Sequence, residues 1–224
     1  MRCFSLSPRL KMCAEFISGK KIVDIGTDHA YLPVYLALGG EIDSAIAADI
    51  NPEPLKRGEN NIVKYGVEDT VTVRLSDGLD SIAPEEADDI VIAGMGGELI
   101  AKIVLRTAWT KNPSKHLILQ PMSRPEVLRE QLFLNGYDIK KEKCVISEGR
   151  LYTVMSVCYT ANAAEPSPRQ KYLGRINKSD DPVLYEQYLE RITGHLMQKA
   201  IGYRLNDNAE EYETILNIIK QIKE

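Results

Sequence analysis

Residues 21–30 read KIVDIGTDHA, and this stretch decides the fold. Its apolar first half ends at Gly26, which is typical of a short buried strand that stops in a sharp turn. The polar residues after the turn lead into residues 31–38, an apolar run that we predict to be a helix. A strand followed at once by a helix is the basic unit of an α/β sheet.

The same unit recurs along the next hundred residues. Further strands are expected at residues 44–50, 71–75, 89–93 and 116–120. Helices are expected at residues 52–65, 98–106 and 125–135. Pro121 is expected to stop the fifth strand, and Ser123 is a candidate cap for the helix that follows it. Five such units predict a parallel sheet with helices on both faces.

The pattern changes after residue 136. Residues 137–147 and 151–159 are two strands joined by a short turn with no helix between them, so they are expected to form an antiparallel hairpin. The predicted fold class is therefore α/β, with a seven-stranded mixed sheet. This order fits the class I methyltransferase (Rossmann-like) architecture better than a dinucleotide dehydrogenase, whose sheet would end with parallel strands.

The C-terminal part is predicted to be helical. Residues 161–169 are a candidate linker. Residues 180–205 carry Leu184, Tyr188, Ile192, Leu196 and Ala200 at steps of four, and residues 210–222 carry Tyr212, Leu216, Ile219 and Ile222 on one face. This predicts an antiparallel helical hairpin, coiled-coil-like, in preference to a dimeric coiled coil. The expected domains are 1–160, which would be catalytic, and 161–224.

Composition excludes several classes of protein. The chain has 224 residues, 44% hydrophobic and 27% charged, which is typical of a globular protein with its own core. It holds no apolar run long enough to cross a membrane, and the first residues do not resemble a signal peptide. The four cysteines, Cys3, Cys13, Cys144 and Cys158, are far apart, so we expect buried free thiols, no metal site and a cytoplasmic location.

Charge is unevenly distributed along the chain. The net charge is −4, yet residues 102–150 hold ten Lys/Arg against five acids. Such a segment is either an ordinary solvated surface or a local phosphate-facing patch, and the composition alone leaves both open.

Polar or glycine-rich residues follow four of the predicted strands, where open α/β sheets bind their ligands. These are residues 24–30, 49–51, 76–78 and 94–97. The first loop lacks the glycines of a dinucleotide-binding fingerprint and holds Asp28 instead, which would repel a pyrophosphate. Asp24 and Asp28 suit a ligand with sulfonium and ammonium charges, so S-adenosylmethionine is favoured over NAD.

Several motifs together resemble the bacterial TrmK family of tRNA methyltransferases. They are VDIGTDHAYLP at 23–33, ADINP at 48–52, SDGL at 76–79, IAGMGG at 92–97 and LQPM at 119–122. The resemblance implies S-adenosylmethionine as the methyl donor and N1 of the adenine at position 22 of a structured tRNA as the acceptor. It also implies that Gly26, Asp28 and His29 form the cofactor loop.

The resemblance assigns further roles. Asp49 and Asn51 would bind the ribose, Asp77 the adenine of the cofactor, and Gly94, Met95 and Gly96 would face the target base. The full set of expected cofactor-binding residues is Asp24, Gly26, Thr27, Asp28, His29, Asp49, Ile50, Asn51, Asp77, Gly78, Gly94, Met95 and Gly96. The expected RNA-binding residues are Lys102, Arg106, Arg124, Arg129, Lys140, Lys141 and Arg150.

Adenine N1 carries an in-plane lone pair and needs no prior deprotonation, so positioning would supply much of the rate. The expected catalytic residues are Asp28, His29, Met95 and Gln120. Asp28 would stabilise the positive charge that develops on the base, with His29 and Gln120 as orienting hydrogen-bond partners. Two other hypotheses stay open: a methyltransferase acting on a small molecule or a protein, and a non-catalytic RNA-binding adaptor. No membrane or metal partner is expected, and a monomer is the simplest oligomeric state.

Overall fold

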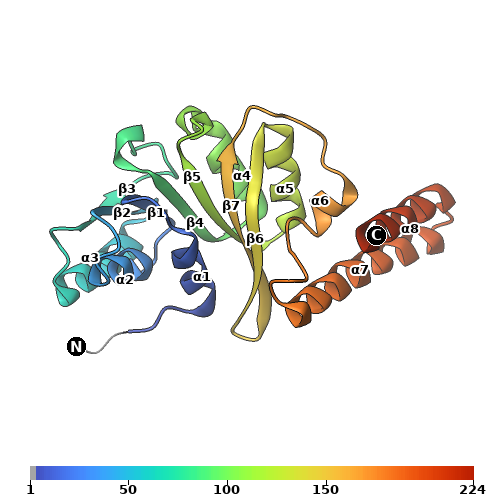
Figure 1. Ribbon diagram of the computed structural model, residues 1–224, viewed down its shortest axis with the longest axis horizontal. Helices are drawn as coiled ribbons and strands as arrows, with labels where there is room; N and C mark the ends of the chain where they lie inside the picture. Colours follow the sequence, from blue (N-terminus) through green and yellow to red (C-terminus); the bar gives the residue numbers. More distant parts are fainter. Residues whose placement is uncertain (1–3) are drawn as a thin grey trace.

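In a computed structural model that describes residues 4–224, a seven-stranded sheet forms the centre of the molecule (Figure 1). The strands are β1 (Lys21–Ile25), β2 (Ser44–Asp49), β3 (Val71–Leu75), β4 (Asp89–Gly96), β5 (His116–Ser123), β6 (Tyr137–Ser147) and β7 (Arg150–Tyr159). Their order across the sheet is β3-β2-β1-β4-β5-β7-β6. The first five run parallel, while β7 is antiparallel to both β5 and β6, so the predicted mixed sheet is confirmed.

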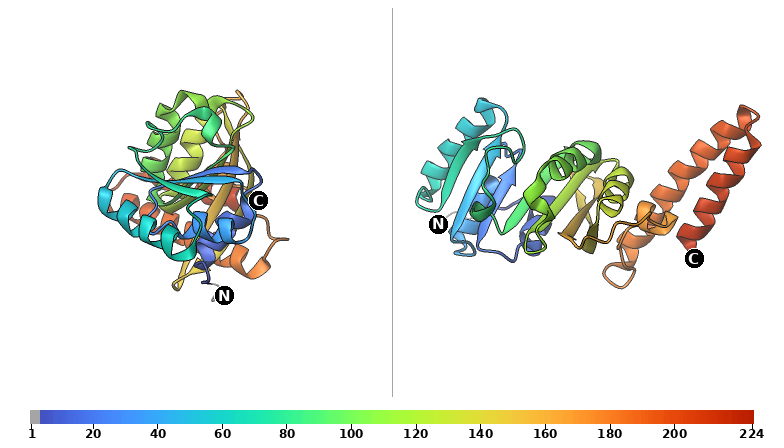
Figure 2. Two further views of the ribbon diagram at one scale, coloured as in Figure 1. Left: turned by 90° about the vertical axis from the view of Figure 1, so that its left-hand side faces the viewer. Right: turned by 90° about the horizontal axis from the view of Figure 1, so that it is seen from above.

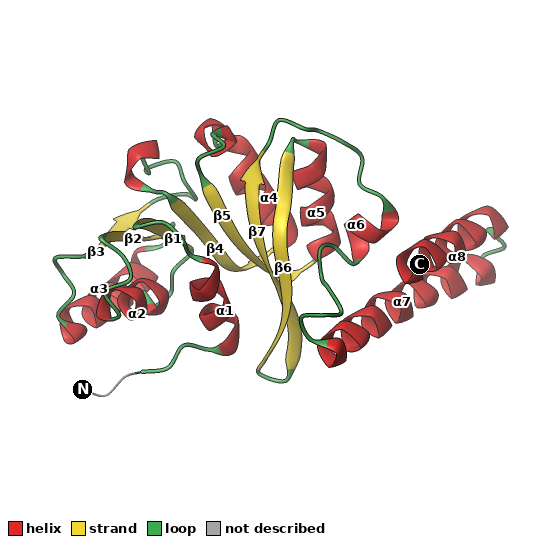
Figure 3. Cartoon of the chain, in the orientation of Figure 1, coloured by secondary structure: helices red, strands yellow, loops and turns green. Residues whose placement is uncertain are grey.

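Helices cover both faces of the sheet (Figure 3). They are α1 (Pro8–Phe16), α2 (Tyr31–Leu38), α3 (Pro52–Tyr65), α4 (Gly97–Arg106) and α5 (Pro125–Leu134), with short 3-10 helices η1 (Pro84–Glu86) and η2 (Ala108–Lys111). Neighbouring residues of β1 point to opposite faces: Ile22 packs in the core beneath α1, α2 and α3, and Val23 packs in the core beneath α4 and α5. Burial on both faces explains why the parallel strands read as continuous apolar runs.

Strands β4 and β5 are longer than predicted. The two strands continue to pair through a bulge at Gly94 until Gly96 lies beside Ser123, so Pro121 does not end β5. The ladder between β5 and β7 ends at Leu119, and no neighbour on that side needs the amide hydrogen that Pro121 lacks. Ser123 is not the cap of α5 either: Arg124 occupies that position with φ of 53° and no side-chain cap.

Helix α1 was not predicted. Only Cys13 and Phe16 of its residues are fully buried, so its sequence carries a weak amphipathic pattern. The helix packs across β4–β7, and Pro8 starts it at a position where a missing amide hydrogen costs nothing. Its first turn lies close to the carboxyl end of β5, since Nη1 of Arg9 is 3.2 Å from Oε1 of Gln120.

The helical hairpin projects from the β6 edge of the sheet (Figure 2). It consists of α7 (Pro182–Leu205) and α8 (Ala209–Lys223), preceded by the short α6 (Pro168–Tyr172), which begins at the end of the expected linker 161–169 and was not predicted. The two long helices pack on one another through Tyr188, Leu196 and Ala200 of α7, which confirms the intramolecular pair. On α8 the predicted Ile219 and Ile222 are buried, together with Ile215, while the predicted Tyr212 and Leu216 are half-buried.

Candidate functional site

The carboxyl ends of β1–β5, here called the mouth of the sheet, bring the predicted loops together. At the end of β1, Gly26 has φ of +77°, and a Cβ atom added there would lie 2.1 Å from Cε of Met95. The positive φ favours glycine at this turn, and the Met95 side chain of the β4 loop packs against its backbone. The amides of Gly26 and Thr27 both donate to the carbonyl of Ala48, which ties the loop to β2.

Asp24 is the buried charge of the mouth. It lies on β1 on the same sheet face as Ile22 and is almost inaccessible to solvent. Burial raises the pKa of its carboxyl group to about 6, although the Thr27 hydroxyl and the Arg9 guanidinium oppose the shift. A carboxylate held in this way gains most from a cationic ligand, as the sequence analysis expected for a sulfonium or ammonium group.

Asp28 and His29 lie further out than Asp24. The Asp28 side chain is 62% exposed and is bound by Arg57 of α3, with Nε 3.0 Å from Oδ1, while Nε2 of His29 lies 3.3 Å from Oδ2. The His29 ring stacks on Tyr31 with centroids 4.9 Å apart. The structure thus brings both predicted residues to the mouth, but Asp28 already holds a counter-ion that sequence reasoning missed.

The ends of β2 and β3 form a second part of the mouth. Oδ1 of Asp49 accepts the backbone amide of Asn51 at 2.7 Å, and in the described residues Oδ2 has no hydrogen bond. Ile50 and Leu75 are both exposed there, although both are large and apolar. A free carboxylate oxygen beside exposed apolar side chains fits a nucleoside, whose ribose hydroxyls donate and whose base packs on an apolar surface.

Asp77 also meets a partner that the sequence did not suggest. Arg106 of α4 binds its carboxylate through Nη2 at 2.8 Å and Nη1 at 3.3 Å, and lies 3.4 Å from Asp80. These hydrogen bonds from Arg106 hold the pKa of Asp77 below its usual range. Arg106 was predicted to bind RNA, whereas here its guanidinium faces the carboxylates of the mouth next to Gly78.

Gln120 organises the centre of the mouth. Its side chain is fully buried, and Oε1 accepts hydrogen bonds from the amide of Gly94 at 3.1 Å and from Nη1 of Arg9 at 3.2 Å. Its Nε2 donates to the carbonyl of Pro121 at 3.0 Å. The predicted residues Gly94, Met95 and Gln120 therefore form one connected unit, and Gly96 is packed against Ser123. Arg9 was missed because no local pattern marks a single arginine in a weakly amphipathic helix.

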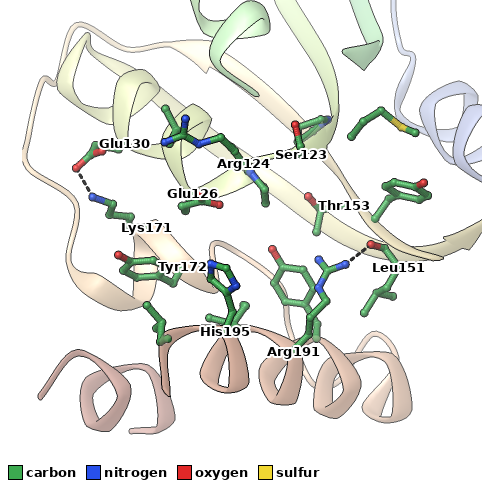
Figure 4. Close-up of a pocket in the computed structure, with 18 of the residues that line it drawn as sticks. Ser123, Arg124, Glu126, Glu130, Leu151, Thr153, Lys171, Tyr172, Arg191 and His195 are labelled. Atoms are coloured by element: carbon green, nitrogen blue, oxygen red, sulfur yellow. Dashed lines mark hydrogen bonds and ion pairs between the residues drawn. The ribbon is translucent and has the colours of Figure 1, made fainter. Parts of the chain in front are cut away.

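A pocket of about 800 Å³ lies beside the mouth, between the sheet and α7 (Figure 4). The carboxyl end of β5, the first turn of α5, the start of β7 and the inner face of α7 line it. Its basic residues are Arg124, Lys171, Arg191, His195 and Lys199. Arg191 donates to the carbonyl of Leu151, and Nζ of Lys171 is 2.5 Å from Glu130. The sequence analysis did not place α7 here.

The predicted RNA-binding residues do not form one surface. The prediction for Arg129 is wrong: its side chain is fully buried and pairs with Glu142. Lys140 pairs with Asp138, and Nζ of Lys141 lies 5.0 Å from the centroid of the Phe16 ring. Lys102 lies exposed on α4 and Arg150 at the β6–β7 turn, so of the predicted set only Arg124 lines the pocket. A basic stretch of an α/β chain is distributed over strands and helices that face different ways.

Residues 4–224 contain no cluster of side chains that could hold a metal ion. Cys13 and Cys144 are buried free thiols as predicted and Cys158 is half-buried, whereas Cys3 lies outside the described residues. Burial raises the pKa of both Cys13 and Cys144 to about 12. No helix among the described residues is long and apolar enough to cross a membrane.

These features define a class of protein: a Rossmann-like α/β sheet with acidic and exposed apolar side chains at the carboxyl ends of its parallel strands. A family model described as a methyltransferase domain matches residues 6–155. The sequence is 38% identical over 156 residues to the tRNA (adenine(22)-N(1))-methyltransferase of Bacillus subtilis, covering 69% of this chain and 66% of that protein, slightly under two thirds of its length.

The solved structures agree along the whole chain. The structure of the B. subtilis tRNA methyltransferase TrmK superposes with a TM-score of 0.84 and 28% identity, covering 98% of this chain and 97% of that one. TrmK of M. capricolum, solved with S-adenosyl-homocysteine, superposes with a TM-score of 0.80 and 27% identity over 98% of this chain and 97% of that one. The chain belongs to the TrmK family of methyltransferases.

Proposed function

We propose that this protein transfers a methyl group from S-adenosylmethionine to N1 of the adenine at position 22 of tRNA. The observation that carries the proposal is the mouth itself, where Asp24, Asp49 and the Gly94–Met95 bulge lie at the carboxyl ends of neighbouring strands. The B. subtilis relative carries this activity in its name, and the similarity extends over the helical hairpin as well as the sheet.

The residues of the mouth fit the cofactor. Asp24 offers a buried carboxylate to positive charge, Asp49 offers a free oxygen to the ribose, and Ile50 and Leu75 offer an apolar surface to the base. When bound, S-adenosylmethionine supplies an electrophilic methyl group. Gly26 has no Cβ and adopts φ of +77°, so the backbone of the β1 loop can turn sharply here and approach a ligand closely.

The chain's own part in the reaction is positioning and charge stabilisation. Gln120 fixes the amide of Gly94 and so holds the β4 bulge at one place beside the β1 loop. Adenine N1 attacks with its own lone pair, so no residue has to remove a proton first. The carboxylates of the mouth stabilise the positive charge that the base acquires. The catalytic role of Asp28 stays a prediction, with Arg57 as its resting counter-ion.

The pocket beside the mouth suits the tRNA body. Arg124, Arg191 and Lys199 line it from both the sheet and α7, so a phosphate backbone would contact both parts of the chain. On this proposal, residues 1–160 carry the reaction and residues 161–224 contact tRNA. Because N1 lies on the Watson–Crick edge, the target base has to leave its stack to reach the mouth. A cytoplasmic location and a monomeric state stay predictions.

The test is incubation of the purified protein with S-adenosylmethionine and two tRNA transcripts that differ only in adenine or guanine at position 22. Mass spectrometry of the digested nucleosides should reveal 1-methyladenosine in the first transcript alone. Equal methylation of both transcripts would contradict the position. Cofactor binding without methylation of any tRNA would favour a small-molecule or protein acceptor, and absence of cofactor binding would favour a non-catalytic adaptor.

A further inference from the structure

One buried hydroxyl group lies at the pocket beside the mouth without a hydrogen bond. Thr153 of β7 is only 2% exposed and lines this pocket (Figure 4). Within residues 4–224 its Oγ1 has no hydrogen-bond partner. A buried hydroxyl that stays unpaired costs free energy, so such atoms are uncommon in folded proteins. Its place on the wall of a pocket indicates that a ligand supplies the missing partner.

The register of β6 and β7 directs Thr153 toward α7. Thr153 is paired with Cys144 of β6, and residues paired across two strands project from the same face of the sheet. Cys144 belongs to the same apolar cluster as Tyr188 and Leu196 of α7. The Thr153 side chain therefore lies on the face where the pocket is, and not in the core beneath α1.

The pocket begins where the mouth ends. Gln120, which accepts the amide of Gly94, is followed directly along β5 by residues 121–123, and all three line the pocket. Three residues of an extended strand span about 10 Å. A tRNA strand that places its target base beside the Gly94 bulge can therefore place its next nucleotide in the pocket.

The rim and the floor of the pocket differ in chemistry. Arg124, Arg191 and Lys199 line it and are exposed. Tyr152 and Leu196 line it and are buried. The exposed cations suit a phosphate group, whereas an apolar floor with one hydroxyl suits a nucleobase, which has apolar ring faces and polar edges.

The pocket is also larger than a phosphate contact requires. Its volume is about 800 Å³, within the range of sites that bind small molecules. Glu126 lines it as well, and its carboxylate would repel a phosphate that entered deeply. A neutral base avoids this repulsion and can pair with the Thr153 hydroxyl, which both donates and accepts hydrogen bonds. The observations favour a base inside the pocket and its phosphate at the rim.

We propose that this pocket binds the base of the nucleotide next to the target adenine in the tRNA strand, with the Thr153 hydroxyl hydrogen-bonded to an edge of that base. The inference rests on the proposed function and deepens it, because the protein would read a second base of its tRNA substrate in addition to contacting the phosphates. A free nucleotide offers the same base and phosphate, and the test below separates the two sources.

The first arm of the test is Thr153→Val, which removes the hydroxyl and nearly keeps the shape of the side chain. Without tRNA, the variant should melt about 1–4 °C higher than the wild type, because no unpaired polar group remains buried. Its kcat/KM for tRNA should nevertheless fall roughly 5- to 20-fold, since the bound base loses a hydrogen bond. Its affinity for S-adenosylmethionine, measured by calorimetry, should not change.

Thr72→Val is the matched control. Thr72 is exposed on β3, at the edge of the sheet opposite the hairpin, so this variant should keep the wild-type kcat/KM for tRNA. A residue with a merely structural role would not combine higher stability with lower activity toward tRNA.

The second arm identifies the base. Two transcripts keep adenine at position 22 and lack only the base on its 5′ side or only the base on its 3′ side. On the transcript that lacks the recognised base, Thr153→Val and the wild type should have equal kcat/KM, because the partner of the hydroxyl is already gone. On the other transcript the loss caused by Thr153→Val should persist in full. Both proteins meet the same transcript, so any effect of the missing base on tRNA folding cancels.

A full loss from Thr153→Val on both abasic transcripts would overturn the inference, because the hydroxyl would then contact neither neighbouring base. An unchanged kcat/KM of Thr153→Val on the intact tRNA would overturn it in favour of a phosphate contact alone or of a free nucleotide. A lower melting temperature would also overturn it, since the hydroxyl would then have a partner inside the folded protein. A wild-type protein that methylates no transcript would contradict the proposed function itself, and the inference with it.

Discussion

Arginine–carboxylate pairs serve opposite purposes at the mouth of the sheet and at the junction between the sheet and the helical hairpin. The junction consists of Arg129 of α5, Glu142 of β6 and Tyr188 of α7, all fully buried. At the mouth, the paired side chains of Arg57 and Asp28 are 45% and 62% exposed. The same residue types therefore hold the helical hairpin against the sheet at the junction, whereas at the mouth they remain accessible to a ligand.

The junction is saturated with hydrogen bonds. Arg129 donates to Glu142 at 2.7 and 3.2 Å, to the hydroxyl of Tyr188 at 2.7 Å, and to the carbonyls of Lys171 and Tyr172 at 3.0 and 2.7 Å. Burial by itself would lower the pKa of Arg129, but Glu142 and Tyr188 raise it, so the charge persists. The network joins α5, β6, α6 and α7, which holds the hairpin at one angle to the sheet.

The largest effect is expected from breaking the junction. Arg129→Met leaves Glu142 buried without a counter-ion and should lower the free energy of unfolding by about 3–5 kcal/mol. Chemical denaturation would measure it. The double variant Arg129→Met/Glu142→Leu should recover most of the loss, because both charges are gone. If the double variant were as unstable as Arg129→Met, the unpaired charge of Glu142 would not be the cause of the lost stability.

Asp24→Asn should separate stability from binding at the mouth. The pKa of Asp24 in the folded protein, about 6, lies above its unfolded value. This group therefore lowers stability as pH rises from about 4 to 6, by up to roughly 2–3 kcal/mol, and the loss persists at pH 7. Asp24→Asn should remove this dependence of the free energy of unfolding on pH, measured by chemical denaturation between pH 4 and 7. The same variant should bind S-adenosylmethionine more weakly. An unchanged slope would mean that Asp24 is not desolvated in solution.

Asp28→Asn tests whether an exposed carboxylate contributes to turnover. Because solvent screens Asp28, we expect a loss of about tenfold at saturating cofactor and tRNA, less than for a buried group. Arg57→Gln is the control: it frees Asp28, and should change the free energy of unfolding by less than ~1 kcal/mol. Turnover of Asp28→Asn near the wild-type value would refute its catalytic role.

The smallest effect is expected in the pocket between the regions. Lys199→Gln should weaken tRNA binding only a few-fold, and should reduce the slope of log affinity against log salt by about one. Lys220→Gln on α8 is the control, since Lys220 is exposed and does not line the pocket. Fluorescence titrations at several salt concentrations would measure both. Equal slopes for the two variants would exclude the pocket as a phosphate contact.

Much of this architecture was predictable, because local patterns encode it. The helix at Tyr31–Leu38 and the strand at Val71–Leu75 have the predicted bounds, and the hairpin of β6 and β7 follows from two strands with no helix between them. The wrong predictions concern element boundaries that depend on contacts distant in the sequence. Strand β5 continues past Pro121 because β4 still pairs with it. Arg124 takes the cap position of α5, where its carbonyl packs against Gly97.

The candidate site also has a part that the sequence predicted and a part that it did not. The loops of the mouth were predictable, since the carboxyl ends of parallel strands share one edge of the sheet. Their partners were not: Arg9 is 111 residues from Gln120, and Arg57 and Arg106 are each 29 residues from the carboxylates they bind. The basic segment 102–150 does not form the single RNA-binding patch that its composition suggested. Arg129 is buried in the core, and the other basic residues lie on several different surfaces.

By itself, the sequence determined the alternation of strands and helices, the placement of acidic and glycine-rich loops at the strand ends, and the helical pair. These depend on periodicity and on residues close together in the chain. Only the tertiary structure decided which charges are buried, which are paired, and that α7 completes a pocket beside the mouth. Burial and pairing depend on side chains that folding brings together from distant positions, and desolvation then sets whether an arginine stabilises the frame or remains free for a ligand.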